Sequence, residues 1–423
     1  MRPLCICIDA RLTDGAGGVQ QVVIGLAHGL SQLTDGDEEY LFLAREDEDA
    51  WLRPYLGGPC RVLHLPPRPA PRWRRLARAA RTRVTSAAPV TRDLWRKCPA
   101  SLFRPGAPQP SDGAIEQAGV DVMHFTSQGA FLTDVPSIYH LHDLQHLHLP
   151  QFFSPRESRD REVAYRTFCR QARLMAVASS WTKSDVVHQY GLPDEKVQVV
   201  PLAPPLAAYP IPTEGDLLSI RTKLALREAF VLYPAQTWAH KNHLGLLEAL
   251  ALLHARHGID VPLVCSGVQN SFFPTIERRV HRLELRDQVR FVGFVSPVEL
   301  QCLYCLCRAV VVPTKFEAAS FPLWEAFLAG APVACSNVTS LPEQAGDAAL
   351  LFDPDRPEEI ADAIARLWTD PALRAALAER GRERVAPFTW QRTARLFRAH
   401  YRRIAGRTLT EEDRTLLEEP PAV

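Results

Sequence analysis

Two glutamates near each other in the sequence, Glu317 and Glu325, have the side-chain chemistry to bind a hydroxylated ligand. They lie in VVPTKFEAASFPLWEAFLAGAPVACS, residues 311–336, with seven residues between them. The pattern predicts a strand that ends at Pro313, then a loop that carries Glu317. A helix containing Glu325 is predicted to begin near Pro322, because proline is favoured in a first helical turn. Carboxylates on such a loop and helix can accept hydrogen bonds from sugar hydroxyls. The alternative is an ordinary strand–loop–helix unit with solvated glutamates.

The loop between the two glutamates consists of small residues, Ala318, Ala319 and Ser320. Small side chains let the backbone approach a ligand closely. The free N–H groups at a helix N-terminus, together with the helix dipole, attract anions. The segment therefore predicts an anion site beside two carboxylates.

A lysine and a histidine elsewhere in the chain also follow predicted strands. Lys241, in a His-Lys-Asn run, comes after the strand that ends near Tyr233, where its ammonium group suits a phosphate. The alternative is a solvated surface lysine. His142, beside Asp143, follows another strand and is predicted to face a cleft.

No metal site is expected. The histidines around His142 match no compact metal-binding pattern, and Asp353-x-Asp355 has the arrangement of a helix cap. The cysteines between Cys302 and Cys307 lie where a helix runs into a buried strand, so we interpret them as small apolar core residues.

The rest of the chain alternates short apolar runs with helix-length segments, which is typical of a parallel sheet covered by helices on both faces. One such series precedes a proline-rich stretch at 201–215, and a second follows it. Strands are predicted at Leu4–Ile8, Tyr40–Leu43, Arg61–Leu65, Val122–Phe125, Ser137–Leu141, Leu174–Val177 and Val197–Val200, and then at Phe230–Tyr233, Leu263–Ser266, Val289–Phe291, Ala309–Val312, Pro332–Cys335 and Ala349–Phe352.

This pattern predicts two doubly wound α/β halves that face a central cleft, where open parallel sheets bind ligands. We expect an N-terminal domain at 1–205, a linker at 206–226 and a C-terminal domain at 227–390. A long helical stretch, Ala376–Ile404, ends the pattern, and residues 391–423 are expected to pack back on the N-terminal domain.

Composition excludes several classes of protein. The 423 residues carry a formal net charge of +1, so no overall positive field indicates a nucleic-acid-binding protein. No apolar run approaches the roughly 20 residues that span a bilayer. The N-terminus lacks the pattern of a signal peptide, and ten cysteines in a chain of this length do not indicate a disulfide framework. We expect a cytoplasmic protein.

The basic insertion, residues 66–110, interrupts the first half. Seven arginines and no acidic residue lie between Arg68 and Arg83, and apolar residues share one helical face of 68–84. The functional interpretation is contact with the inner face of an anionic membrane or with a lipid-linked anionic acceptor. The alternative is a solvated surface insertion.

The segment 311–336 resembles the E-x7-E element of glycosyltransferase family 4, whose members are retaining enzymes of the GT-B fold. Other segments match the family in the expected order, from about Asp9 to about Tyr401, with the basic insertion as the main unmatched part. They are DGAGGVQQVVIGLAHGL (14–30), YHLHDLQHLHLPQFFS (139–154), AVASSWTKSDVVHQYGLPDEKVQVVPLA (176–203), YPAQTWAHKNHLGLLEAL (233–250) and VRFVGFVSPVELQCLY (289–304).

The resemblance implies a role for each matched residue. Glu325 would bind the ribose hydroxyls of a nucleotide-sugar donor, and Glu317 would hold hydroxyls of the transferred sugar. Lys241 would face the donor phosphates, and His142 would lie beside the sugar. Glu317 and His142 are the expected catalytic residues, which would orient the sugar and ease the development of charge. The remaining expected donor-binding residues contribute backbone, namely Gly17, Gly18, Ala319, Ser320 and Phe321.

The chain departs from the family pattern at two places. The usual Glu-Gly-Phe-Gly/Ser is Glu-Ala-Ala-Ser at 317–320, whose small residues are expected to preserve the amide site. An arginine that often precedes the lysine is missing, since Gln236 and His240 occupy that stretch. Lys241 is therefore expected to neutralise more of the phosphate charge.

The resemblance implies a retaining, metal-independent hexosyltransferase that needs no cofactor. Its donor would be a nucleotide sugar, with GDP-mannose as the first candidate, and its acceptor a saccharide or lipid-linked glycan. The alternatives are a nucleotide-sugar epimerase or a phosphorylase of the same fold, and a non-catalytic nucleotide- or membrane-binding protein.

Overall fold

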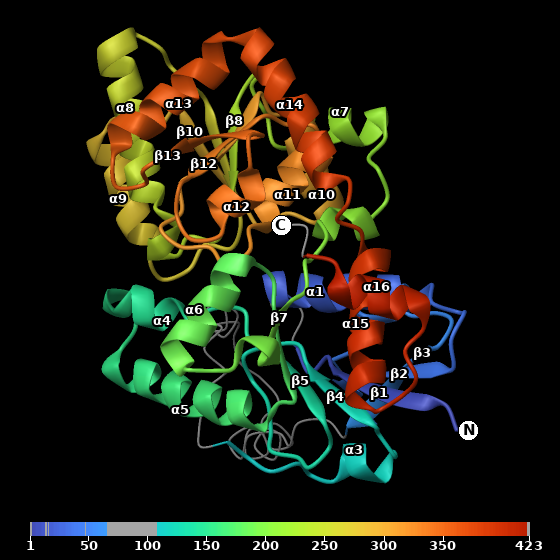
Figure 1. Cartoon of the computed structure of the whole chain (residues 1–423). Helices are drawn as coiled ribbons and strands as arrows, with labels where there is room; N and C mark the ends of the chain where they lie inside the picture. The colour runs from blue at the N-terminus through green and yellow to red at the C-terminus, as the bar shows by residue number, and fades with distance from the viewer. Residues whose placement is uncertain (1, 13–14, 16, 47, 66–107, 421–423) are drawn as a thin grey trace, which may run out of the picture.

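The structure is a computed structural model that describes residues 2–12, 15, 17–46, 48–65 and 108–420. The helix expected at 68–84, and all of the basic insertion before residue 108, lie outside the described residues. Within the described ranges, no helix is long and apolar enough to cross a membrane. The two halves of the chain form an upper and a lower lobe (Figure 1).

The N-terminal half is built on a sheet of seven parallel strands in the order β3-β2-β1-β4-β5-β6-β7. The central strands are almost wholly buried because helices cover both faces. The strands are β1 (Leu4–Asp9), β2 (Glu38–Arg45), β3 (Cys60–Leu65), β4 (Val122–Phe125), β5 (Ser137–His140), β6 (Leu174–Val177) and β7 (Val197–Val199). The helices are α1 (Gly18–Ser31), α3 (Ala114–Gln117), α4 (Gln145–His148), α5 (Pro155–Gln171) and α6 (Ser180–Tyr190).

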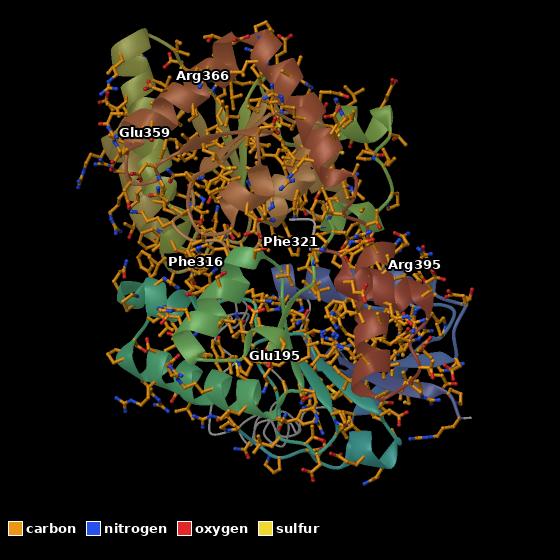
Figure 2. All side chains as sticks on the ribbon, in the orientation of Figure 1. Glu195, Phe316, Phe321, Glu359, Arg366 and Arg395 are labelled. Carbon is orange, nitrogen blue, oxygen red and sulfur yellow. The ribbon has the colours of Figure 1, made fainter. Side chains whose placement is uncertain are left out.

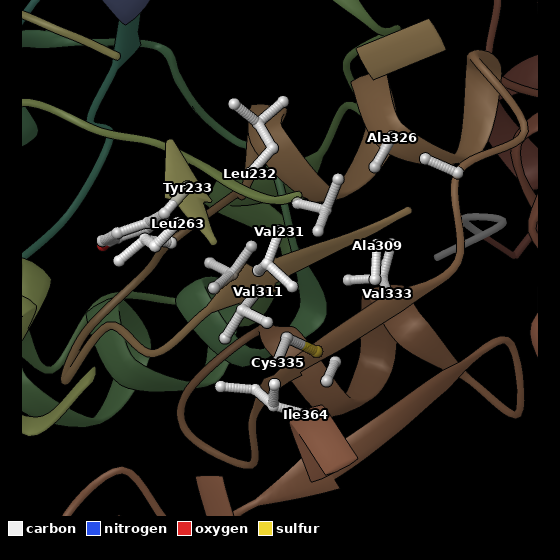
Figure 3. Packing of buried hydrophobic residues seen from close by; sticks show 14 of the residues in the cluster. Val231, Leu232, Tyr233, Leu263, Ala309, Val311, Ala326, Val333, Cys335 and Ile364 are labelled. Atoms are coloured by element: carbon white, nitrogen blue, oxygen red, sulfur yellow. The ribbon is translucent and has the colours of Figure 1, made fainter. Parts of the chain in front are cut away.

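The C-terminal half repeats this plan with six parallel strands in the order β10-β9-β8-β11-β12-β13. The strands are β8 (Val231–Pro234), β9 (Leu263–Ser266), β10 (Val289–Gly293), β11 (Ala309–Val312), β12 (Val333–Ser336) and β13 (Ala349–Phe352). The helices are α8 (His243–His257), α9 (Phe273–Arg282), α10 (Pro297–Leu306), α11 (Phe321–Leu328), α12 (Leu341–Ala345), α13 (Pro357–Thr369) and α14 (Pro371–Val385). Figure 3 shows Val231, Val311 and Val333 among the buried residues of its core. Two facing α/β lobes of this kind form the GT-B fold.

The proline-rich stretch between the lobes is more ordered than the sequence suggests. Residues 205–208 form a short 3-10 helix, and α7 (Glu214–Lys223) begins within the stretch that we expected to be irregular. The cap explains this helix, because the Thr213 hydroxyl accepts from the backbone N–H of Asp216 while the Asp216 carboxylate accepts from that of Thr213. Leu206 and Ile220 are buried in the C-terminal core, so this core begins before residue 227.

The helical stretch expected at Ala376–Ile404 is in fact two helices. It ends at Val385 in α14 and resumes in α15 (Trp390–Ile404), which is followed by α16 (Glu411–Glu418). Pro387 lacks the N–H that a continuing helix needs, and the Thr389 hydroxyl caps α15 by accepting from Arg392 N. At this break the chain crosses between lobes, since α14 lies in the upper lobe whereas α15 and α16 lie against the lower one (Figure 1).

The contact between α1 and α15 depends on glycine. A Cβ atom at Gly25 would lie 2.0 to 2.3 Å from three ring atoms of Trp390. We expect Gly25→Ala to destabilise the protein by about 1–3 kcal/mol, the usual cost of overpacking, measured as a lower midpoint of thermal unfolding. Gly215→Ala is the matched control, because a Cβ there meets only one atom, at 3.7 Å, and alanine favours helix α7. Equal midpoints for the two variants would contradict this packing.

Candidate active site

A cleft of about 710 Å³ lies between the lobes. The N-terminal lobe contributes Gly17, Gly18 and His142 to its lining, and the C-terminal lobe contributes Lys241, Glu317 and Glu325. Phe316 and Phe321, which flank the loop between the two glutamates, lie at the boundary of the lobes (Figure 2). The cleft is at the carboxyl ends of strands from both sheets, where doubly wound proteins bind ligands.

The glycine loop lies close to the opposite lobe. Gly17 has φ of 70°, in the region that favours glycine, and a Cβ on it would lie 3.1 Å from Nε2 of Gln236. A Cβ on Gly18 would lie 3.6 Å from the ring of Phe321. The start of α1, whose first N–H groups have no helical partner, is thus exposed directly to the cleft.

An ion pair between Lys241 and Glu317 occupies the C-terminal wall of the cleft. The side chains are 20% and 12% exposed, so solvent screens the pair only in part. Lys241 is the single lysine or arginine among the described residues that line the cleft. The sequence places these residues in separate segments and does not predict this contact.

The backbone around the pair is held by hydrogen bonds. The Thr339 hydroxyl accepts from the N–H of Glu317 at 3.0 Å, and the Ser340 hydroxyl donates to its carbonyl at 2.9 Å. The phenol of Tyr233 donates to the carbonyl of Lys241 at 2.6 Å. Thr339, Ser340 and Tyr233 are supporting residues that carry no recognisable sequence signal, because only the fold brings them to the site.

Glu325 lies in α11, where it is buried, and it is one of the residues that line the cleft. The hydroxyl of Tyr304 donates to its Oε2 at 2.8 Å. Burial raises the pKa of the Glu325 carboxyl to about 7, and the hydrogen bond from Tyr304 opposes that rise. At neutral pH the carboxyl therefore exchanges between its protonated and ionised forms.

The ribose contact that the resemblance implies for Glu325 predicts a pH dependence. Nucleotide affinity is then expected to rise about tenfold between pH 6 and pH 8, because hydroxyls donate best to an ionised carboxylate and each pH unit below a pKa costs up to tenfold. The raised pKa affects folding stability in the opposite direction. In the protein without ligand, the stability that the protonated carboxyl contributes is lost as the pH rises from about 4.5 through about 7. Calorimetric titration across this range measures the affinity. Glu325→Gln should flatten the profile, whereas Tyr304→Phe should move its midpoint to higher pH; an unchanged profile in both would contradict the assignment.

His142 lies on the N-terminal wall. Its Nε2 is 2.8 Å from the carbonyl oxygen of Thr126, which can only accept, so this nitrogen carries the proton and Nδ1 is the acceptor. Burial lowers the pKa of His142, so the ring is neutral at pH 7. The ring stacks on His140 with centroids 4.5 Å apart, and His140 in turn stacks on His124. These stacked rings fix the orientation of His142 toward the cleft.

One expected amide donor, Ser320, already has a partner within the protein. Ser320 is fully buried and is not among the residues that line the cleft, and its N–H already donates to Oε1 of Gln344 at 2.8 Å. In this structure the loop turns Ser320 inward to meet α12, and a ligand contact from Ser320 stays a prediction. Ala319 and Phe321 do line the cleft.

The residues that replace the family's usual arginine are uncharged. Oε1 of Gln236 accepts from the indole of Trp238 at 2.9 Å, and its Nε2 faces Gly17. Burial lowers the pKa of His240 to about 3, with the charge of Lys241 adding to the effect. In the described part of the chain, no group of three His, Cys, Asp or Glu residues is arranged to hold a metal ion. Metal-independent chemistry stays a prediction.

Comparison with known proteins identifies the family of the chain. The family model described as Glycosyltransferase Family 4 matches residues 16–203, and the model described as Glycosyl transferases group 1 matches residues 218–384. The O-antigen chain mannosyltransferase B of Escherichia coli is 29% identical over 252 residues, 59% of this chain and 66% of that protein. The MMP alpha-(1->4)-mannosyltransferase of Mycolicibacterium hassiacum is 29% identical over 243 residues, 56% of each.

The alignment with each of these two relatives spans less than two thirds of the relative's length. Among solved structures, HepE of Anabaena in complex with UDP and glucose has a TM-score of 0.68 at 18% identity, over 94% of this chain and 99% of that one. That likeness supports the GT-B fold. The two family matches together extend over both lobes and the cleft between them, and the chain is therefore a member of glycosyltransferase family 4.

Proposed function

We propose that this protein is a retaining hexosyltransferase that moves a hexose from a nucleoside-diphosphate sugar to a hydroxyl of a saccharide or lipid-linked glycan. The observation that carries the proposal is one cleft that holds the Lys241–Glu317 pair and the buried carboxyl of Glu325 on one lobe, and Gly17, Gly18 and His142 on the other. A cation and two carboxylates in one cleft suit a ligand that carries both phosphates and hydroxyls.

In this arrangement each side chain has one part of the donor to bind. Glu325 accepts hydrogen bonds from the ribose, and Lys241 binds the diphosphate with the amide groups at the start of α1. Glu317 then accepts from hydroxyls of the hexose. His142, being neutral, orients the hexose through hydrogen bonds and does not supply a proton.

The proposed chemistry exchanges one bond at the anomeric carbon. The bond from this carbon to the phosphate oxygen breaks as the acceptor oxygen forms a new bond on the same face, which retains the configuration. The departing phosphate oxygen takes the proton of the acceptor hydroxyl. Lys241 and the helix-terminal amides stabilise the negative charge that develops on the diphosphate, without requiring a metal ion.

The first donor to test is GDP-mannose, since the Escherichia coli and Mycolicibacterium relatives are mannosyltransferases by name. UDP-glucose is the second, because the Anabaena neighbour was solved with UDP and glucose. The name of the Escherichia coli relative, an O-antigen chain mannosyltransferase, also supports a glycan acceptor.

The test has two steps. Thermal unfolding is first followed with GDP, UDP and their sugars, where a ligand at a hundredfold excess over its Kd adds about 2.7 kcal/mol of stability. Nucleotide release is then measured with and without mannose-terminated oligosaccharides. Release that requires the acceptor supports the transferase. Isomerised sugar formed without acceptor would indicate an epimerase. A sugar phosphate formed only with inorganic phosphate would indicate a phosphorylase. Tight nucleotide binding with no turnover would indicate a non-catalytic protein.

A further inference from the structure

A second contact between the lobes lies beside the cleft. The N-terminus of α6, in the N-terminal lobe, receives the carboxylate of Glu343 from α12 in the C-terminal lobe. Oε1 of Glu343 accepts from the backbone N–H of Ser180 at 2.6 Å, and Oε2 accepts from that of Trp181 at 2.9 Å. These N–H groups have no partner within the helix, and the helix dipole adds to the attraction for a carboxylate.

The same turn of α6 also holds the loop between the two glutamates. Ser179, the N-cap residue, accepts from the N–H of Thr182 and donates its own hydroxyl hydrogen to the carbonyl of Ala318 at 2.9 Å. Ala318 directly follows Glu317. The indole of Trp181 packs edge-on against Phe316, with ring centroids 5.6 Å apart. The N-terminal lobe therefore contacts this loop on both sides of Glu317.

Residues 339–344 hold the loop from the other side. Thr339 and Ser340 bind the backbone of Glu317, and Gln344 accepts from the N–H of Ser320. Glu343 is the neighbour of Gln344, and it alone in this segment reaches across to α6. Arg384 fixes the backbone here, since its guanidinium donates to the carbonyls of Glu343 and Gln344 at 2.6 and 3.2 Å.

We propose that Glu343 is a positioning residue that couples closure of the two lobes to the placement of the Glu317 carboxylate. When the lobes close, Glu343 docks on α6 and the Ser179 hydroxyl reaches Ala318, which fixes the loop from both sides. When they open, both contacts break together and the loop keeps only its bonds to residues 339–344. The inference rests on the proposed function, because it assigns Glu317 to the transferred sugar.

The experiment compares Glu343→Ala, Glu343→Gln and wild type for nucleotide Kd, for kcat of transfer, and for the radius of gyration by small-angle X-ray scattering. For Glu343→Ala we expect kcat to fall about 10- to 100-fold, as for the loss of two hydrogen bonds to a charged group. Kd for GDP or UDP should stay within about threefold, because Lys241 and Glu325 are untouched. The radius of gyration with nucleotide bound should exceed that of wild type.

Two further variants sharpen the test. Glu343→Gln keeps one acceptor oxygen and should recover part of the kcat. Ser179→Gly removes the shorter of the two bonds from α6 hydroxyls to the carbonyl of Ala318, since Thr182 also donates to it at 3.4 Å. Glycine is tolerated at N-caps, so the variant should lower kcat at little cost to the helix cap. Glu383→Gln is the matched control, an exposed glutamate on α14 whose change should alter nothing.

The outcomes separate this inference from the proposed function. The positioning role is wrong if Glu343→Ala transfers sugar at the wild-type rate. It is also wrong if the fall in kcat is matched by an equal loss of nucleotide affinity and by a lower unfolding temperature. If wild type transfers no sugar although it binds nucleotide, the proposed function fails first. An unchanged radius of gyration alongside a lower kcat would also overturn the coupling to closure.

Discussion

Replacing Glu317 by glutamine is expected to lower the turnover of sugar transfer by about 10²- to 10³-fold, while nucleoside diphosphate affinity stays equal or becomes tighter. Loss of charge-assisted hydrogen bonds to two sugar hydroxyls accounts for the fall, at about 1.5–3 kcal/mol for each bond. The gain in affinity follows from the ion pair, because Lys241 is engaged by Glu317 in the free protein and would be released for the phosphates.

Steady-state kinetics with a saturating donor, together with calorimetric titration of the nucleotide, separates the two effects. The substitution leaves the backbone bonds from Thr339 and Ser340 in place, so the loop should keep its shape. Glu317→Ala should reduce turnover at least as far, again with nucleotide affinity preserved. An equal loss of affinity and turnover would remove Glu317 from the sugar subsite.

Lys241→Ala is expected to have the opposite pattern, with nucleoside diphosphate affinity reduced about 10²-fold. A charge-assisted bond to phosphate is lost, and Glu317 is left as an unpaired carboxylate facing the diphosphate. No other lysine or arginine among the described lining residues can replace the charge. The loss should be smaller for the nucleoside alone, which carries no phosphate, and titration of both ligands checks this.

The double variant Lys241→Ala with Glu317→Gln gives the control. Removing both charges should recover part of the diphosphate affinity that Lys241→Ala loses, because the repulsion from Glu317 disappears. If the double variant binds the diphosphate as weakly as Lys241→Ala does, the charge of Glu317 has no influence on donor binding. Similar weakening of the nucleoside and the diphosphate by Lys241→Ala would place Lys241 away from the phosphates.

Local sequence patterns were sufficient for much of the fold. The expected strands lie within a residue or two of β1 to β13, because buried parallel strands are short apolar runs separated by helix-length segments. The pattern failed where a local signal was misleading. Prolines around α7 hid the capping box of Thr213, and a continuous helical composition hid the break at Pro387.

Site residues could be predicted where a sequence motif specifies the ligand contact. They could not be predicted where tertiary packing determines the position of a side chain. Glu317, Glu325, Lys241 and His142 all line one cleft, as the order of motifs suggested. The inward turn of Ser320 depends on Gln344, 24 residues further along the chain. No local pattern contains such a pairing, nor the raised pKa of Glu325, which results from burial by the surrounding fold.

The path of α15 has a consequence for how the protein is made. Its Trp390, Phe397 and Tyr401 are part of the same buried cluster as Leu4 and Ile6 of β1. On the ribosome, the first lobe emerges long before these residues do, and α1 meanwhile exposes the face around Gly25 that Trp390 will cover. The C-terminal lobe, whose core needs nothing from α15, can complete its folding earlier. The lobe that is synthesised first is thus the last to be finished, and a nascent chain stalled before Trp390 carries an open apolar surface on which chaperones can act.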